Sequence, residues 1–140
     1  MSNLEQQHVI GQLIHKLRRM ERQPRTFGEA GELTPSEMHT IEVIGCGEGI
    51  LMSELAMKLS ITKGAATQIV SRLEREDFVH RHAHPVDLRS VVVSLKERGE
   101  IAYWAHEAMR KEFTETLRRE LGDEGYRSFE KGLSKFIECL

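Results

Sequence analysis

The segment KGAATQIVSR, residues 63–72, carries small, hydroxyl and basic side chains where a solvent-facing helix would usually carry Glu and Lys. Its apolar residues recur at helical spacing, so they form the buried side and leave the other positions facing outward. Glutamine can pair bidentately with adenine, hydroxyl groups can donate to bases or phosphates, and basic side chains can hold phosphates or guanine. The residues predicted to contact DNA on this helix are Lys63, Gly64, Thr67, Gln68, Ser71 and Arg72.

The elements around this helix would position it on DNA. Apolar residues from Met52 to Leu59 predict a short helix just before it. Two short helices joined by a brief turn form a helix-turn-helix, whose second helix can lie in the major groove. Residues 78–82 and 90–95 have strand character, and HPVDLR reads as the turn between them. This hairpin would add a wing, and Arg89 beside its turn is placed to enter an adjacent minor groove.

A helix is also predicted to start at TPSE, residues 34–37. Thr34 can cap it, Pro35 suits the first helical position, and Glu37 lies three residues after Thr34, as in a capping box. The helix is expected to end at the glycines of residues 45–49. Before it, residues 23–32 are interpreted as a linker because a proline and two glycines break helical periodicity there.

The two ends of the chain are predicted to be helical. Residues 4–22 have one apolar stripe at three- and four-residue spacing, residues 96–121 form a long helix, and residues 126–140 form a last helix with one apolar side. The expected fold is mainly α with a small β-hairpin wing. We expect a single domain over residues 1–140, with a winged helix-turn-helix lobe at 34–95 and dimerisation helices at 1–22 and 96–140.

Composition narrows the class of protein. A chain of 140 residues can bury one modest core. Its net charge of -2 gives no overall attraction to nucleic acid, so a polyanion site must be local, and residues 62–98 carry seven Lys and Arg against five acids. Two cysteines are too few for a disulfide scaffold, and no apolar run suits secretion or membrane spanning. We expect a cytoplasmic protein without a membrane partner.

With these motifs in place, the sequence resembles the MarR family of winged-helix transcriptional regulators over nearly its whole length. LTPSEMHTIEVIG resembles the second helix of the family, MSELAMKLSITKGAATQIVSRLEREDFVHR its helix-turn-helix, and HPVDLRSVVVSLKERG its wing with the Asp-x-Arg signature. The resemblance implies that Asp87 orients the wing arginines and that Arg89 touches DNA. Leu88 stands where the family usually has another Arg, and Lys96 replaces the usual Thr that caps the long helix.

The family is dimeric, and the outer helices agree with that state on physical grounds. The apolar stripes of residues 4–22 and 126–140 lie at opposite ends of the chain, and a small winged-helix core needs neither. We expect them to bury each other across a two-fold axis of a homodimer. The expected function is a repressor that binds a pseudo-palindromic DNA operator and is released by a small-molecule or metal effector at the junction of dimer helices and DNA-binding lobes.

A zinc-responsive regulator is the first alternative, because His39, His106 and Glu21 resemble metal ligands in a zinc-responsive branch of the family. Imidazole and carboxylate groups suit Zn²⁺. Arg110, however, occupies the position where that branch has its second histidine of the long helix, and a cation there would repel a metal. The competing interpretation is that His39 and His106 simply form hydrogen bonds near the interface.

Other chemistry has less support in the sequence. His80, His82 and His84 would share one face of a strand, where they are expected to lie near phosphates or water rather than to bind metal. Cys46 and Cys139 are interpreted as small core residues. The chain has no glycine-rich phosphate loop, nucleophile elbow or H-E-x-x-H motif, so no enzyme is expected. A winged helix used only for protein contacts, the last alternative, would need an apolar recognition surface, which residues 63–72 do not supply.

Overall fold

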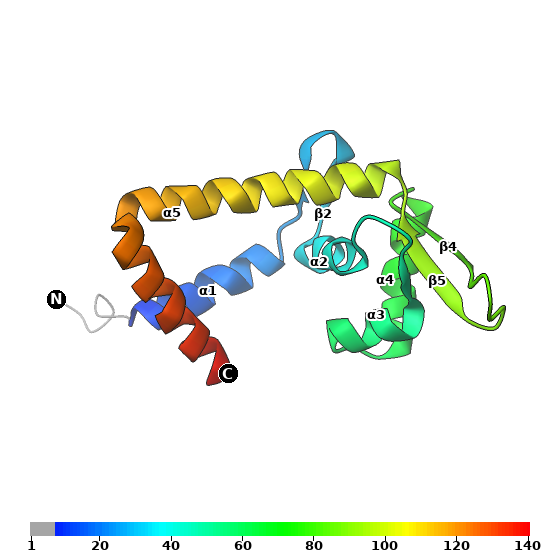
Figure 1. Ribbon diagram of the computed structural model, residues 1–140, viewed down its shortest axis with the longest axis horizontal. Coiled ribbons are helices and arrows are strands. Elements are labelled where there is room, and N and C mark those ends of the chain that lie inside the picture. Colours follow the sequence, from blue (N-terminus) through cyan, green and yellow to red (C-terminus); the bar gives the residue numbers. More distant parts are fainter. Residues whose placement is uncertain (1–7) are drawn as a thin grey trace. The chain divides into compact units, whose positions relative to one another are not determined.

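The computed structural model describes residues 8–140 as two compact units, one reaching Ala105 and the other beginning at His106. The fold is mainly helical with small antiparallel sheets, which confirms the predicted fold class (Figure 1). The elements in chain order are α1 (Val9–Glu21), β1 (Arg25–Thr26), the 3-10 helix η1 (Gly28–Ala30), β2 (Glu32–Leu33), α2 (Pro35–Ile44), β3 (Ile50–Leu51), α3 (Met52–Leu59), α4 (Lys63–Arg75), β4 (Val79–Ala83), β5 (Val91–Leu95) and α5 (Glu97–Glu138).

Helix α2 begins through the predicted capping box. The Thr34 hydroxyl accepts a hydrogen bond from the Glu37 backbone N–H at 3.2 Å, and the Glu37 carboxylate accepts one from the Thr34 backbone N–H at 3.2 Å. Pro35 holds the first helical position, where its missing N–H costs nothing. The helix ends at Gly45, whose φ of 67° favours glycine. Both ends of α2 are therefore set by local sequence.

The core of the first unit lies under α4. Three side chains on one face of this helix, Ala66, Val70 and Leu73, are fully buried. Val70 and Leu73 belong to one apolar cluster with residues from α2, α3 and the sheet, including Ile41, Leu55 and Val93. This burial confirms the predicted inner face of α4 and fixes the rotation of the helix about its axis.

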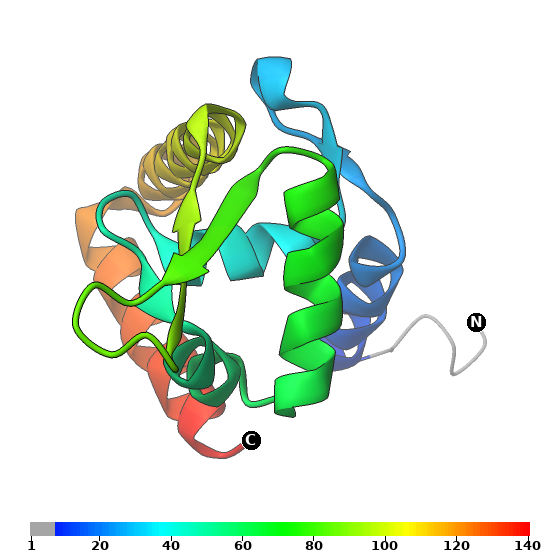
Figure 2. The same cartoon turned by 90° about the vertical axis from the view of Figure 1, so that its right-hand side faces the viewer.

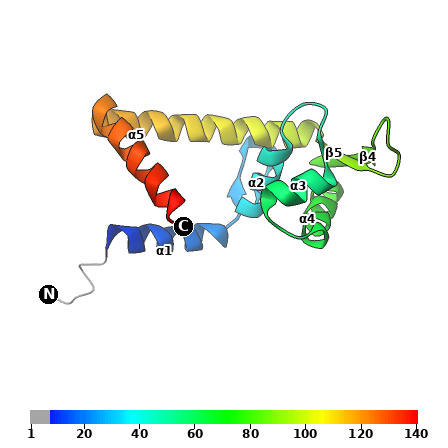
Figure 3. The ribbon, with the colours of Figure 1, turned by 60° about the horizontal axis from the view of Figure 1, so that its bottom comes forward.

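A three-stranded sheet adjoins these helices, in the order β3-β5-β4, with every pairing antiparallel. The predicted β4–β5 hairpin is confirmed, and its loop projects away from the helices of its unit (Figure 3). Strand β3, which pairs Ile50 with Val93, was not predicted. It is two residues long and follows Gly49, whose φ is +95° and where a Cβ would collide with the Val93 carbonyl oxygen.

The interpretation of residues 23–32 as a linker is wrong. Strands β1 and β2 pair there around η1, and the side chains of Phe27 and Ala30 are buried in the core. The segment is held by the Phe27 backbone N–H, which donates to the Gly31 carbonyl at 2.8 Å, and by the Arg98 Nε, which donates to the Ala30 carbonyl at 2.9 Å. Long-range contacts therefore fix the conformation of a segment whose local sequence does not specify one.

The helical ends follow the predictions within the described residues. Helix α1 covers residues 9–21 of the predicted 4–22, His8 precedes it, and residues 4–7 lie outside the described part of the chain. In α5, Gly122 has φ 74° and ψ 167°, so the helix is interrupted between the two helices predicted from the sequence. In the second unit Tyr126 is buried, with the Arg118 guanidinium 4.8 Å from its ring centroid. No helix among residues 8–140 is long and apolar enough to cross a membrane.

Gly99, in the first turns of α5, is predicted to be essential for the close approach of α5 to β4. A Cβ on Gly99 would collide with the Phe78 carbonyl oxygen and press on Leu95 at 3.2 Å. We expect Gly99→Ala to lower the free energy of unfolding by about 1–3 kcal/mol, as overpacking does. Gly132→Ala is the control, because nothing lies within 4 Å of its added Cβ. Urea unfolding measures both variants, and equal stability of Gly99→Ala and the wild type would contradict the prediction.

Candidate nucleic-acid interface

Helices α3 and α4 form the predicted helix-turn-helix. Ser60 ends α3 in the left-handed conformation, with φ 56°, and turns the chain toward α4. Thr62 then caps α4, because its hydroxyl accepts a hydrogen bond from the Ala65 backbone N–H at 3.1 Å. The first turn of α4 contains Lys63 and no acid, although the helix dipole favours negative charge there. A cation at this helix start suits an anionic partner better than it suits the isolated helix.

The outer face of α4 contains the residues predicted to contact DNA. Ser71 is half-buried and the rest are exposed: Lys63, Gly64, Thr67, Gln68 and Arg72. Figure 2 shows α4 and the β4–β5 hairpin on the same side of the first unit. The structure thus brings the predicted helix and the predicted wing to one surface.

Thr67 differs from its prediction as a hydrogen-bond donor. Its hydroxyl donates to the Lys63 carbonyl at 2.8 Å, one turn back in the same helix. With the proton used there, the Thr67 oxygen is left to accept hydrogen bonds from outside, and its methyl group is also available. Toward a base edge, this side chain suits an exocyclic amine of adenine or cytosine, or the methyl group of thymine.

Arg72 is already engaged within the protein. Its guanidinium lies 3.4 Å from the Glu37 carboxylate, and the side chain of Glu37 is only 8% exposed against 58% for Arg72. Removing Arg72 would leave a nearly buried carboxylate without its cation, which costs stability. Arg72 therefore links α4 to α2, and its substitution would not report on DNA contact alone.

The wing loop is organised by two side chains. The His84 Nδ1 accepts hydrogen bonds from the backbone N–H groups of Val86 and Asp87, both at 3.1 Å. The Asp87 carboxylate accepts hydrogen bonds from the Arg89 backbone N–H and the Ser90 hydroxyl, both at 3.1 Å. Its Oδ1 also lies 3.7 Å from the Arg89 Nε, while the Arg89 side chain is 96% exposed. Asp87 thus lies where it can orient Arg89.

The three wing histidines, expected on one strand face, have different structural roles. His80 and His82 lie on β4 with their rings stacked, 5.3 Å between centroids, but His84 lies beyond the strand and holds the loop. His82 and His84 line one hollow, as neighbours on a shared face would, and His84 has the additional role of holding the loop. Sequence reasoning missed its role because the contact depends on the shape of the loop, and the only local signal was a histidine two residues before Val86.

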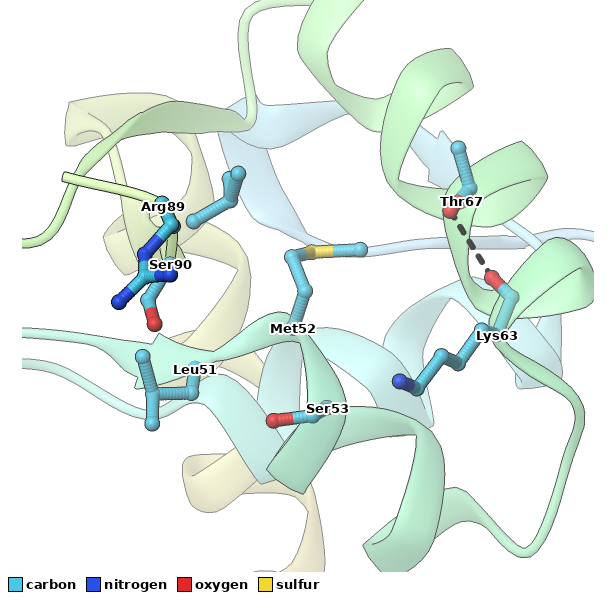
Figure 4. Close-up of a pocket in the computed structure, with 8 residues that line it drawn as sticks. Leu51, Met52, Ser53, Lys63, Thr67, Arg89 and Ser90 are labelled. Carbon is cyan, nitrogen blue, oxygen red and sulfur yellow. Dashed lines mark hydrogen bonds between the residues drawn. The ribbon is translucent and has the colours of Figure 1, made fainter. Parts of the chain in front are cut away.

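A hollow of about 300 Å³ lies between the helix-turn-helix and the wing. Figure 4 shows Arg89 and Ser90 on one side of it and Lys63 and Thr67 on the other. Its lining comes from β3, the start of α3, the first turns of α4, the end of the wing loop and the start of β5: Leu51, Met52, Ser53, Lys63, Thr67, Arg89, Ser90 and Val91. Two cations and several hydroxyl groups surround one opening, an arrangement that suits phosphate groups.

Two ion pairs fix the wing strands to the end of α4. The Glu74 carboxylate accepts hydrogen bonds from the Arg81 backbone N–H at 2.8 Å and from its guanidinium at 2.9 Å and 3.2 Å. These bonds lower the pKa of Glu74. Lys96 donates to the Asp77 carboxylate at 2.9 Å, which lowers the pKa of that carboxyl. The lysine that departs from the family pattern is thus used to hold the turn after α4.

The candidate metal ligands do not form a cluster in the described chain. Residues 8–140 contain no group of three or more His, Cys, Asp or Glu side chains that could hold a metal ion. The His39 Nδ1 lies 3.6 Å from the Glu42 carboxylate, and Glu21 is exposed at the end of α1. His106 belongs to the second unit. A metal site of Glu21, His39 and His106 stays a prediction.

The cysteines were predicted to be core residues, and this prediction is wrong. Cys46 and Cys139 are both exposed. Desolvation, with Glu100 nearby, raises the pKa of the Cys46 thiol. A raised pKa disfavours the reactive thiolate.

A helix-turn-helix followed by a small sheet with a projecting hairpin defines the winged-helix class of proteins. Comparison with known proteins makes the assignment more specific. The MarR family model matches residues 33–91. The chain is 26% identical to the HTH-type transcriptional regulator PchR of Bacillus subtilis, over 100% of this chain and 89% of PchR. It is also 26% identical to the multiple antibiotic resistance protein MarR of Escherichia coli, over 91% and 90% of the two chains.

Solved structures of similar fold agree. Streptococcus pneumoniae FabT in complex with DNA has a TM-score of 0.74 at 24% identity, over 92% of this chain and 88% of FabT. The zinc-responsive MarR family member ZitR of Lactococcus lactis has a TM-score of 0.71 at 19% identity, over 96% and 94%. At these identities the structures support the fold alone. Together, the family match over residues 33–91 and the two relatives make the chain similar to members of the MarR family of transcriptional regulators.

The Glu74–Arg81 pair predicts a pH-dependent contribution to stability. Because the pKa of Glu74 is lowered in the folded protein, its contribution is full above its ordinary value and is lost as pH falls through the lowered pKa. Glu74→Gln should cost no more than about 1 kcal/mol at pH 7, because solvent screens this partly exposed pair. Urea unfolding should show the difference from wild type shrinking below about pH 4. A difference that persists undiminished at low pH would contradict this origin, and Glu115→Gln on α5 is the control.

Proposed function

We propose that this protein is a homodimeric transcriptional repressor that binds a pseudo-palindromic operator, with α4 in the major groove and the wing at the adjacent minor groove. The observation that carries the proposal is the single surface formed by the outer face of α4, the hollow and Arg89. A chain with a net charge of -2 offers two cations, Lys63 and Arg89, at one polar opening there. Release by a small-molecule or metal effector and action in the cytoplasm belong to the same proposal and rest on the family resemblance.

Gly64 supports close approach of the α4 backbone to a partner. A Cβ at this position would meet only the Thr62 hydroxyl oxygen, at the ordinary contact distance of 3.9 Å. Packing within the protein therefore does not require glycine here, although glycine in a helix costs roughly 0.5–1 kcal/mol relative to alanine. A need for free space next to the outer face of α4 explains the glycine at position 64 better. In the proposed complex, that space is filled by the floor or wall of the major groove.

Gln68 and Thr67 would read bases in this arrangement. The Gln68 amide can donate to and accept from adenine at the same time, and the Thr67 oxygen can accept from an exocyclic amine. Lys63 and Arg89, at the two sides of the hollow, would contact phosphates or the adjacent groove. This division gives base contacts for specificity and cationic contacts for affinity.

Substitution of Gly64 separates DNA contact from folding. We expect Gly64→Met to leave the free energy of unfolding equal or up to about 1 kcal/mol higher, because methionine has the better helix propensity. The same change should lower operator affinity at least tenfold, because its side chain would occupy the space of the base edges. Fluorescence anisotropy on an operator selected from random duplexes measures this loss.

Gln68→Ala is the companion variant, with an expected loss of roughly 1–3 kcal/mol in operator binding and none in stability. Lys131→Ala, on α5 in the second unit, is the control for substitution of an exposed residue outside the proposed DNA-binding surface. If Gly64→Met and Gln68→Ala both bind the operator as the wild type does, α4 is not the recognition helix.

The dimer proposal rests on the apolar stripe of α1. No residue of this helix is buried, and its large apolar side chains are 37–77% exposed: Val9, Ile10, Leu13, Ile14, Leu17 and Met20. Phe129 and Ile137 on α5 are also exposed, as is Leu140 just after it. Such a stripe along one helix favours burial against a second copy of the chain.

Charge placed on this stripe should disrupt the dimer. Leu13→Glu combined with Leu17→Glu is expected to shift the chain to monomer, because carboxylates would have to be buried in the interface. Sedimentation velocity gives the oligomeric state. Lys16→Glu, also exposed on α1, is the matched control and should remain dimeric. A dimeric double variant would show that α1 is not part of the interface.

A further inference from the structure

We propose that the wing tip is an apolar wedge, in which Val86 and Leu88 contact the sugar walls of the operator's minor groove beside Arg89. This inference rests on the proposed DNA-binding function and adds a contact class to it. The side chains of Val86 and Leu88 are 88% and 78% exposed. Two neighbouring aliphatic side chains exposed at a projecting tip form a small apolar patch, and such patches mark surfaces that bind a partner.

The loop that presents these side chains is held by hydrogen bonds. His84 Nδ1 binds the backbone N–H groups of Val86 and Asp87, and the Asp87 carboxylate binds the Arg89 N–H and the Ser90 hydroxyl. Two backbone bonds close the same loop, from the His84 N–H to the Ser90 carbonyl at 2.9 Å and from the Ser90 N–H to the Asp87 carbonyl at 3.0 Å. Val86 and Leu88 therefore stand on an ordered support, which reduces the entropy lost on binding.

The neighbourhood of the wedge selects its partner. Arg89, the next residue, is 96% exposed, and it lines the same hollow as Lys63. Aliphatic tips directly beside an exposed guanidinium match the minor groove, where apolar sugar edges form the walls and phosphates line the rim. Minor-groove proteins combine basic residues with apolar side chains, which they frequently insert between base steps. A protein partner would have to match the same cation and the same two side chains, and continuity with the α4 surface favours DNA.

Leu88 makes the wedge specific to this chain. The family usually has another Arg at this position, and an Arg there would contact phosphate or enter the groove as a cation. A leucine contact releases no counterions, so it adds affinity without adding salt dependence. It depends instead on groove width, and we infer that this wing selects operators by the shape of the flanking minor groove.

The test is a set of anisotropy titrations of the full chain on its selected operator at several salt concentrations. We expect Val86→Ala with Leu88→Ala to weaken binding roughly tenfold at every salt concentration, with an unchanged slope of log K against log salt. Arg89→Ala is the matched control in the same loop, and its slope should become shallower by about 1. Leu88→Arg should steepen the slope by about the same amount. Both apolar residues are exposed, so circular dichroism should show intact folding.

Wild-type affinity and slope in the Val86→Ala, Leu88→Ala double variant would overturn the wedge, as would a loss that disappears at high salt. If Gln68→Ala loses operator binding while the double variant does not, the wedge fails and the proposed function stands. If the wild-type chain selects no DNA sequence, both fail together. If the double substitution abolishes binding to a protein and leaves DNA binding unchanged, the proposal is also overturned.

Discussion

The burial of one face of α4 is the constraint on which the rest of the structure depends. Ala66, Val70 and Leu73 have no solvent exposure, so the helix cannot rotate about its axis without exposing them. A helix has only one such face, and its burial points Gly64, Thr67 and Gln68 away from the core. A small hydrophobic cluster thereby determines which side chains a partner meets. The proposed DNA-binding surface is a consequence of the core.

Polar links then set the wing against that helix. Glu74, near the end of α4, holds the backbone and the guanidinium of Arg81 on β4, and Lys96 holds Asp77 in the turn between them. Arg98 lies over the Phe78 ring at 4.3 Å and donates to the Ala30 carbonyl, so the same region is tied to the β1–β2 hairpin. The positions of α4 and β4 are coupled through neighbouring side chains. In the proposed complex, α4 and a wing joined in this way would meet two grooves together.

Local sequence signals predicted much of this arrangement. The capping box of Thr34 and Glu37, the apolar period of α4 and the β-branched run of β5 are each complete within a few residues, so pattern alone identified them. Strand β3 and the β1–β2 hairpin were missed because their order comes from distant partners, Val93 and Arg98. The same reason explains the site: the exposed residues of α4 were predictable, whereas the Arg72–Glu37 pair and the support of the wing loop by His84 depend on contacts that appear only on folding.

The central claim is that α4 and the wing of a dimer read a specific DNA sequence. Selection from a pool of random duplexes by the full chain, followed by sequencing of the bound fraction, tests it most directly. The account predicts enrichment of an inverted repeat whose half-site centres lie about 10–10.5 base pairs, or a multiple of that, apart. A bound fraction with the same sequence composition as the starting pool would contradict it.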